Sequence, residues 1–278
     1  MAAAESLHRR TRDTLARLGV RPRRRLGQNF LVASPVVERI VAAADVGGRT
    51  VVEIGAGVGA LTDALAAVAR ELVLVEIDPR MAQRLRERFA ARPGVRVHTA
   101  DALEVDFATL LEGRERAIAI GNLPYSVGTA ILARLLEAPA RFARLVLMLQ
   151  LEVAQRLVAT PGTKAYGLLT VLSALYGDAR VVLRVSPGAF VPRPKVDSAV
   201  VVIEVATAPR APVLDEGWFR QIVRRSFGQR RKTLRAALAP VAATADIERA
   251  GIDPRRRGET LSLEEFARLS NALRERRG

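Results

Sequence analysis

Four consecutive residues, Asn122, Leu123, Pro124 and Tyr125, have the types and order that suit chemistry on an exocyclic amine. An amine conjugated to a purine ring is a poor nucleophile because its lone pair is delocalised. The Asn122 side-chain oxygen and the Leu123 backbone carbonyl can accept both N–H bonds and help to localise that lone pair. Pro124 stiffens the turn that aims these acceptors, and Tyr125 can stack on an extruded base. The tetrad therefore predicts methylation of such an amine, without a strong general base because the amine becomes acidic as it attacks.

A second aromatic side chain, Phe190, lies in the proline-rich segment AFVPRPKVDS. Placed over the other face of the base, it would form a stacking pair with Tyr125. The alternative is a loop phenylalanine that packs on the core. The residues alone leave both interpretations open.

A glycine-rich turn between a strand and a helix, in VVEIGAGVGALTDAL, is the expected cofactor site. Gly55, Gly57 and Gly59 let the backbone turn sharply and pass close to a ligand. The spacing from Gly55 through Gly57 to Ala60 also satisfies the relaxed fingerprint of dinucleotide-binding enzymes. The turn by itself does not identify the ligand.

Three carboxylates around this turn favour S-adenosylmethionine. Glu76 ends the second strand, about twenty residues on, where a carboxylate can bind ribose hydroxyls. Asp101 follows the third strand and can accept from an adenine amino group, or else cap the next helix. Glu53 precedes the first glycine, where it would repel a pyrophosphate but suits a cationic sulfonium.

A parallel sheet must position these residues, because β-rich runs alternate with helical patterns from about residue 50 to 205. The pattern predicts a class I, Rossmann-like α/β sheet of seven strands, at 51–54, 72–77, 95–99, 117–121, 145–149, 180–185 and 199–205. Helices are expected at 35–44 with Ser34 as the cap, then at 60–69, 79–91, 127–136, 151–158 and 167–176. The last two strands are joined too tightly for a crossover helix, so we expect an antiparallel hairpin with a long loop.

Three parts are expected along the chain. Residues 1–22 are predicted to be a flexible basic segment, residues 23–207 the methyltransferase catalytic domain, and residues 208–278 a small all-helical RNA-binding domain. The linker is ATAPRAP at 206–212, and only helical patterns follow it, at 216–226, 232–239, 245–251 and 262–273.

The formal net charge of +15 is concentrated at the two ends of the chain. Residues 1–30 hold eight basic and two acidic residues, and residues 206–278 hold sixteen and nine. The middle, residues 31–205, is near neutral with twenty basic and eighteen acidic residues. This distribution suggests a catalytic body with polyanion-binding edges, although solvated arginine faces would give the same composition.

The composition also excludes several classes of function. With no cysteine and only His8 and His98, neither a metal site nor a histidine triad is expected. No apolar run approaches the roughly 20 residues that cross a bilayer, and the start lacks the apolar core of a secretory signal. We expect a cytoplasmic monomer without a metal ion.

With these residues in place, the chain resembles the ribosomal RNA adenine dimethyltransferases. The resemblance extends from about Arg23 to Leu273, so it covers both the expected catalytic domain and the helical domain after it. The resemblance rests on GQNFL, EIGAGVGALT, VEID, NLPYS, MLQLEVAQRL, FVPRPKVDSAVV and FGQRRKTL. GQNFL and FVPRPKVDS are the most specific of these, because generic methyltransferases lack them. Within the family, the chain looks most similar to the bacterial small-subunit branch.

The resemblance implies S-adenosylmethionine as the cofactor, contacted by Asn29 and Leu31 as well as by Gly55, Glu76, Asp101 and Asn122. It implies dimethylation at N6 of two adjacent adenines in the 3′-terminal hairpin of 16S rRNA, in the small ribosomal subunit or its precursor, and a role in subunit biogenesis. Arg230, Arg231 and Lys232, in FGQRRKTL, are expected to meet RNA phosphates.

Two positions depart from the family pattern without removing a group that the chemistry needs: Leu151 replaces a lysine, and Ser126 replaces an asparagine. Several alternatives remain. A large-subunit methyltransferase of macrolide resistance shares the glycine turn and the tetrad, whereas a DNA adenine methyltransferase would carry proline in place of Leu123. A ribosome-assembly or transcription factor could keep the fold without catalysis, and a Rossmann oxidoreductase is the most distant alternative. The forms FVPRPKVDS and RRKTL favour the small-subunit enzyme.

Overall fold

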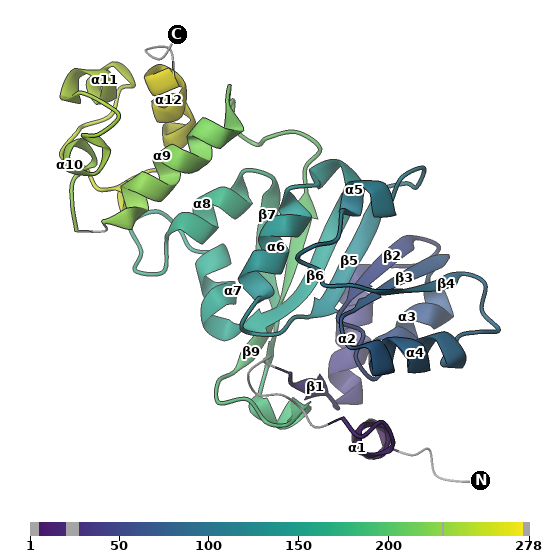
Figure 1. The fold of residues 1–278 in the computed structure, drawn as a ribbon. Coiled ribbons are helices and arrows are strands. Elements are labelled where there is room, and N and C mark those ends of the chain that lie inside the picture. The colour runs from purple at the N-terminus through teal and green to yellow at the C-terminus, as the bar shows by residue number, and fades with distance from the viewer. Residues whose placement is uncertain (1–5, 21–27, 230, 275–278) are drawn as a thin grey trace. The chain divides into compact units, whose positions relative to one another are not determined.

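The computed structural model describes residues 6–20, 28–229 and 231–274 (Figure 1). Its packing divides the chain into two compact units. Unit 1 comprises Met1–Ala154 and Arg180–Val205, and unit 2 comprises Gln155–Ala179 and Ala206–Gly278. Within the described ranges, no helix combines the length and apolar character that a membrane crossing needs.

Unit 1 is built on a seven-stranded sheet in the order β4-β3-β2-β5-β6-β9-β7. The strands are β2 (Thr50–Ile54), β3 (Glu71–Glu76), β4 (Val95–Thr99), β5 (Ala117–Asn122), β6 (Phe142–Gln150), β7 (Gly177–Val185) and β9 (Ser198–Val205). Strands β2 to β6 pair with one another in parallel, and β9 runs antiparallel to β6. The predicted fold class is thus confirmed.

Burial along the strands shows why the sheet needs helices on both faces. All five residues of β2 are buried, whereas every residue of the edge strand β4 is half-buried or exposed. Figure 1 shows helices in front of the sheet and behind it. They are α2 (Ser34–Ala44), α3 (Thr62–Val68), α4 (Pro79–Arg88), α5 (Phe107–Leu110) and α6 (Gly128–Leu136). Ala33 takes the cap position of α2, so Ser34 is its first residue and not its cap, contrary to expectation.

The strand order reverses between β2 and β5, and this reversal creates the crevice for the site. From β2 the chain proceeds outward through β3 to β4, whereas β5 lies on the other side of β2 and leads to β6. In such sheets, ligands bind where the carboxyl ends of the two diverging strands meet. The glycine turn after Ile54 and the tetrad that begins at Asn122 therefore lie side by side.

A separate pair of two-residue strands joins the two motifs that are most specific to the family. β1 (Phe30–Leu31) lies antiparallel to β8 (Phe190–Val191), with Leu31 opposite Phe190. The Val32 amide extends the pairing by donating to the Ala189 carbonyl at 2.8 Å. Periodicity could not reveal strands this short, because two residues carry no repeat.

The described part of the N-terminal segment contains a helix. Residues Leu7–Arg17 form helix α1, with Leu7, Thr11, Thr14 and Leu15 buried. These four positions follow helical spacing and lie on one face, so the helix can pack on the sheet domain despite its many arginines. The described part of this segment, residues 6–20, thus contains a helix with a buried face, and the flexibility of residues 1–22 stays a prediction.

Unit 2 contains the helices α8 (Leu168–Ala174), α9 (Glu216–Gly228), α10 (Leu234–Leu238), α11 (Thr244–Arg249) and α12 (Leu263–Arg274). Helix α7 (Leu151–Leu157) crosses the division between the units. The expected boundary near residue 208 differs from this division, because residues 155–179 group with the C-terminal helices. Tyr166 shows the reason: its hydroxyl donates to the Leu261 carbonyl at 2.6 Å, and its ring packs against Phe227.

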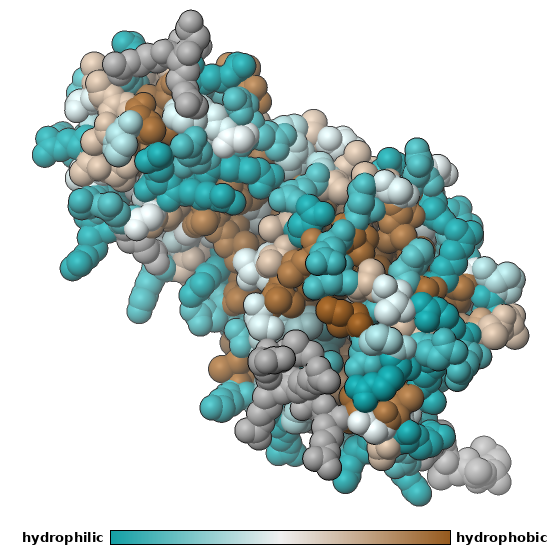
Figure 2. Space-filling model, viewed as in Figure 1, coloured by the Kyte–Doolittle hydropathy of each residue, from teal (hydrophilic) through white to brown (hydrophobic). Residues whose placement is uncertain are grey.

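Most of the surface in view is hydrophilic. Figure 2 shows charged and polar residues over most of this face, with the apolar residues in separate patches. The most exposed large apolar side chains are spread along the chain, and they include Ile77 and Leu214. Of these two, Ile77 borders the pocket described next.

Candidate active site

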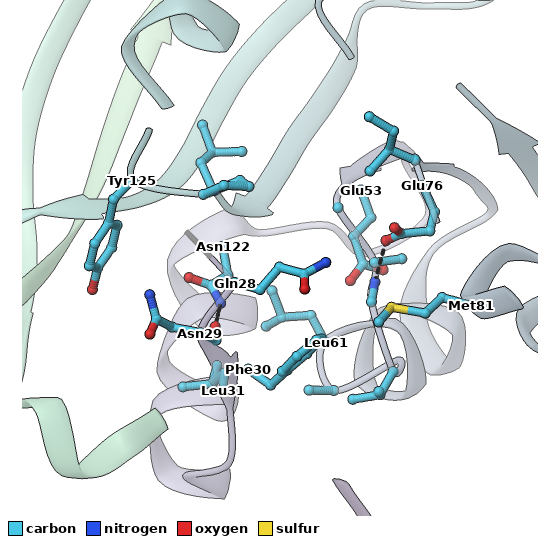
Figure 3. Close-up of a pocket in the computed structure, with 18 residues that line it drawn as sticks. Gln28, Asn29, Phe30, Leu31, Glu53, Leu61, Glu76, Met81, Asn122 and Tyr125 are labelled. Atoms are coloured by element: carbon cyan, nitrogen blue, oxygen red, sulfur yellow. Dashed lines mark hydrogen bonds between the residues drawn. The ribbon is translucent and has the colours of Figure 1, made fainter. Parts of the chain in front are cut away.

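A pocket opens in unit 1 at the carboxyl ends of β2 and β5 (Figure 3). It brings together nine of the residues expected from the sequence: Asn29, Leu31, Gly55, Gly57, Glu76, Asn122, Leu123, Pro124 and Tyr125. Figure 3 shows Tyr125, Asn122 and Asn29 at one end of the pocket and Glu76 and Met81 at the other. The amine-directed group and the cofactor-directed group thus face one continuous space.

The Asn122 side chain is held in one orientation. Its Nδ2 donates to the Asn29 backbone carbonyl at 2.7 Å. Because an amide has one donor end and one acceptor end, this bond leaves Oδ1 as the end that can receive a hydrogen bond from an amine. The GQNFL motif therefore sets the direction of the tetrad's key acceptor.

The backbone of the tetrad is anchored on both sides. The Leu123 amide donates to the Met148 carbonyl at 3.2 Å, and the Leu123 side chain is buried. The Pro124 carbonyl accepts from the Val127 and Gly128 amides, which start helix α6. A turn fixed at both ends presents its acceptors with little reorganisation, which is the condition for electrostatic stabilisation of a transition state.

Gly121, immediately before the tetrad, contributes through its lack of a side chain. A Cβ at this position would lie 2.8 Å from the Ile54 carbonyl oxygen and 2.8 Å from a Leu123 methyl carbon. The close approach of β5 to the end of β2 thus depends on glycine. Sequence reasoning missed this residue, although a glycine inside a strand pattern was a signal for close backbone approach.

Tyr125 is oriented by a residue that sequence reasoning also missed. Its hydroxyl lies 2.5 Å from the Ser198 hydroxyl, and Ser198 is fully buried at the start of β9. Burial raises the pKa of Tyr125, with the Ser198 hydrogen bond opposing that effect. The signal was present in the sequence, because Ser198 is the last residue of FVPRPKVDS.

The glycine turn has the backbone conformation that its residues predict. Gly55, Gly57 and Gly59 all have positive φ, at 70°, 57° and 89°. A Cβ on Gly57 would meet the Phe30 ring at 3.3 Å. Phe30 thus forms the wall beneath the turn, and it is a pocket residue that the sequence did not identify.

Glu76 fastens the glycine turn to the end of β3. One carboxylate oxygen accepts from the Gly57 amide at 2.7 Å, and the other accepts from the Asp78 amide at 2.9 Å. Burial raises the pKa of Glu76, and the hydrogen bonds from the Asp78 and Gly57 amides partly lower that pKa again. Each carboxylate oxygen keeps a further lone pair, so Glu76 can still accept from the hydroxyls of a ligand.

Glu53 is a buried acid at the base of the pocket. Its side chain is 1% exposed, and its Oε2 has no hydrogen-bond partner among the described residues. Burial raises the pKa of Glu53 to about 8; the Thr62 hydroxyl lowers it, and the nearby Glu76 and Asp63 carboxylates raise it further. A buried carboxyl with an unpaired oxygen that faces a pocket is suited to a cationic ligand group.

Two expected site residues lie outside the pocket lining. The Asp101 carboxylate accepts from the Leu103 amide at 2.9 Å within a turn, and the next helix, α5, is capped by Asp106 and not by Asp101 as the alternative expected. Phe190 is 1% exposed and belongs to the hydrophobic core, so in this conformation its ring does not cover the pocket. The reason is the pairing of β8 with β1, which turns Phe190 into the interior.

The residues expected to bind RNA belong to unit 2. Arg231 and Lys232 are exposed just before α10, and the Lys232 amide donates to the Gln229 carbonyl at 2.8 Å. Arg230 lies outside the described residues. The structure thus leaves the two described cations available to a polyanion.

Taken together, the doubly covered sheet and the oriented amide acceptor define an amine methyltransferase. The chain belongs to the ribosomal RNA adenine dimethylase family, whose model matches residues 19–275. As a member of this family it is an enzyme that methylates ribosomal RNA adenine.

Two full-length relatives are named ribosomal RNA small subunit methyltransferase A. The protein from Moorella thermoacetica is 45% identical over 95% of this chain and 96% of its own length. The protein from Geobacter sulfurreducens is 46% identical over 92% of this chain and 96% of its own length.

Two solved structures share the fold. A dimethyladenosine transferase from Plasmodium falciparum has a TM-score of 0.72 at 23% identity, covering 86% of this chain and 95% of that chain. The 23S rRNA methyltransferase ErmE has a TM-score of 0.67 at 29% identity, covering 88% of this chain and 100% of that chain.

Proposed function

We propose that this enzyme uses S-adenosylmethionine to dimethylate N6 of two adjacent adenines in the 3′-terminal hairpin of small-subunit rRNA. The observation that carries the choice of subunit is the similarity, at 45% identity along nearly the whole chain, to proteins named for the small subunit. Similarity to the 23S rRNA methyltransferase is lower, at 29% identity. The small-subunit alternative is therefore favoured over the large-subunit one.

The pocket residues fit S-adenosylmethionine. Glu76 has lone pairs for ribose hydroxyls, and Ile77 and Met81 offer apolar surface for a flat ring. The unpaired oxygen of Glu53 would complement the positive charge of the ligand. Asp101 remains a proposed contact, since its hydrogen bond to the Leu103 amide uses only Oδ1. When bound, the cofactor supplies an electrophilic methyl group on its sulfonium.

The tetrad then acts on the adenine amine. Asn122 Oδ1 and the Leu123 carbonyl accept its two N–H bonds, and Tyr125 stacks on the ring of the extruded base. A second stacking ring at Phe190 would require the β1–β8 pair to move, because that ring is buried. We therefore assign the stacking role to Tyr125 and assign Phe190 the role of supporting Leu31 across the strand pair.

The RNA surface of unit 2 is proposed to include Arg230, Arg231 and Lys232. Replacing all three with glutamine should flatten the dependence of RNA affinity on salt, because fewer phosphates are neutralised. Arg39→Gln, which changes an exposed arginine on α2 of unit 1, is the control for loss of a single surface charge, so the slope change in the triple variant should exceed three times its effect. An unchanged slope in the triple variant would remove these residues from the RNA surface.

The test of the function is transfer of labelled methyl groups to small and large ribosomal subunits that lack dimethyladenosine, followed by nucleoside analysis. We expect N6,N6-dimethyladenosine in small-subunit RNA alone. Label in large-subunit RNA would assign the enzyme to the resistance branch. Binding without any label would favour an assembly factor.

A further inference from the structure

A second hollow in unit 1 lies between α1 and α4 and is lined with arginines. Arg10 and Arg17 reach it from α1, and Arg84 and Arg88 reach it from α4. Residues four apart on a helix share a face, as do residues seven apart, so each helix directs a pair of guanidinium groups into the same space. The spacing of the arginines along the two helices therefore places all four side chains at the hollow.

The hollow is rich in cations relative to anions. Asp63 is its only lining carboxylate among the described residues. Asp63 pairs with Arg88 at 2.7 Å and lies 3.7 Å from Arg10. Neither Arg17 nor Arg84 forms an ion pair with a carboxylate in the part of the chain that the structure describes. Two of the four positive charges thus lack a counter-ion among the residues that the structure describes.

The neighbouring positive charges affect the pKa of Arg84. Burial lowers the pKa of this guanidinium, and the like charges of Arg17 and Arg88 lower it further. The Asp63 and Glu87 carboxylates oppose these effects without cancelling them. An anion in the hollow would relieve the repulsion and also replace the solvation that burial has removed.

Polar groups that face the hollow are also unsatisfied. The Thr11 hydroxyl is buried, with the residue 2% exposed, and it has no hydrogen-bond partner among the described residues. The Arg84 Nε is likewise buried without a partner, while its Nη2 donates to the Thr14 hydroxyl at 3.2 Å. Buried donors are normally paired, so these two point to a ligand with several acceptor oxygens.

We propose that the hollow between α1 and α4 binds a backbone phosphate of the substrate RNA. Phosphate offers the tetrahedral set of oxygens that several guanidinium groups and a hydroxyl can share. A polyanion is favoured over a free ion because the sequence carries a further run of cations, RPRRR at residues 21–25, separated from the end of α1 by three residues. The inference rests on the small-subunit RNA substrate proposed above.

Helix α1 also packs against residues of the cofactor pocket, so RNA bound at α1 would affect that pocket. Leu15 on α1 and Val20 after it pack in one cluster with Phe30, Val58 and Met81. The last three residues also line the cofactor pocket. RNA bound at α1 would therefore stabilise one wall of that pocket.

The test is the salt dependence of binding to a small-subunit 3′-hairpin RNA, measured by fluorescence anisotropy. The site variant is the double substitution Arg10→Gln and Arg17→Gln, which changes two exposed residues and should leave the fold intact by circular dichroism. The matched control is Arg9→Gln with Arg12→Gln, which removes the same charge from the same helix, away from the hollow. We expect the site variant to lose about tenfold in affinity and its log–log salt slope to fall by about 1, with a much smaller change in the control.

Equal losses in the two double variants, or no loss in either, would overturn the proposal. A second experiment measures thermal unfolding with and without inorganic phosphate. If phosphate stabilises the wild type but not the site variant, the result supports phosphate binding in the hollow. If that stabilisation disappears while the RNA salt slope is unchanged, the hollow binds a free ion and the RNA assignment is wrong. Wild-type methylation of the same RNA, measured in parallel, separates failure of this site from failure of the proposed function.

Discussion

The side-chain amide of Asn122 donates to the backbone carbonyl of Asn29 at 2.7 Å, across 93 positions of sequence. This bond joins the end of β5 to the residue just before β1. It determines which end of the Asn122 amide remains to accept a hydrogen bond from an amine. The loop that carries the tetrad is therefore oriented by a motif that precedes the whole sheet in the chain.

Replacing Asn122 tests this orientation directly. Asn122→Ala removes the acceptor, and Asn122→Asp keeps an acceptor but loses the donor to Asn29. We expect methyl transfer to fall by roughly a hundredfold or more in both variants, as for other preorganised transition-state contacts. RNA affinity should stay within about twofold of wild type, since phosphate contacts dominate it. Loss of RNA binding in Asn122→Ala would show that the tetrad and the RNA surface are not separable.

The hydroxyl pair of Tyr125 and Ser198 can be examined by a double-mutant cycle. Tyr125→Phe and Ser198→Ala each break the same hydrogen bond, so the double variant should cost little more than either single variant. We expect each single change to reduce methyl transfer by about tenfold, equivalent to about 1.4 kcal/mol, while the aromatic ring remains able to stack. Strictly additive effects would show that Ser198 does not act through Tyr125.

Glu53 should make the stability of the protein depend on pH. Its pKa is raised from 4.5 in the unfolded chain to about 8 in the fold, so between these values the folded state holds a proton that the unfolded state has lost. Stability then falls as pH rises through this window, by at most about 1.4 kcal/mol per pH unit, and is constant on either side of it. Glu53→Gln should remove this contribution to the slope and stabilise the protein at neutral pH.

Thermal unfolding of wild type and Glu53→Gln from pH 5 to pH 9 measures this effect, with the exposed Glu38→Gln as control. The advantage of Glu53→Gln should be small at the acid end of the range and grow toward pH 8. A bound sulfonium would favour the ionised form of Glu53 and lower its pKa, so the same variant should lose affinity for S-adenosylmethionine more than for the uncharged-sulfur product, and the loss should grow as the pH rises toward 8. A pH-independent difference in stability would mean that Glu53 is not protonated in the fold.

Gly121→Ala tests the close approach of β5 to β2. The new Cβ would lie 2.8 Å from the Ile54 carbonyl oxygen, so the strand end and the tetrad after it must shift. We expect a loss of about 1–3 kcal/mol in stability together with a reduced turnover. Gly47→Ala is the control, because no atom lies within 4 Å of the Cβ that it would add. Equal effects of the two substitutions would show that steric contact at Gly121 is unimportant.

The elements that position the site could be read from the sequence. All seven strands were expected close to where they occur, and so were the glycine turn and the tetrad at the ends of β2 and β5. The physical reason is that these features are local. Buried strands appear as apolar runs, and a tight turn needs glycine wherever φ is positive.

Only the tertiary structure decided which distant residues meet. The pairing of β1 with β8 buries Phe190 and brings GQNFL to the tetrad, and the hydroxyl of Ser198 reaches Tyr125 across 73 positions. The grouping of residues 155–179 with the C-terminal helices, and the arginine-lined hollow under α1, arise in the same way. Periodicity and propensity describe how each segment folds, but partners far apart in the chain are chosen by packing and hydrogen bonding, which act only once the segments are assembled.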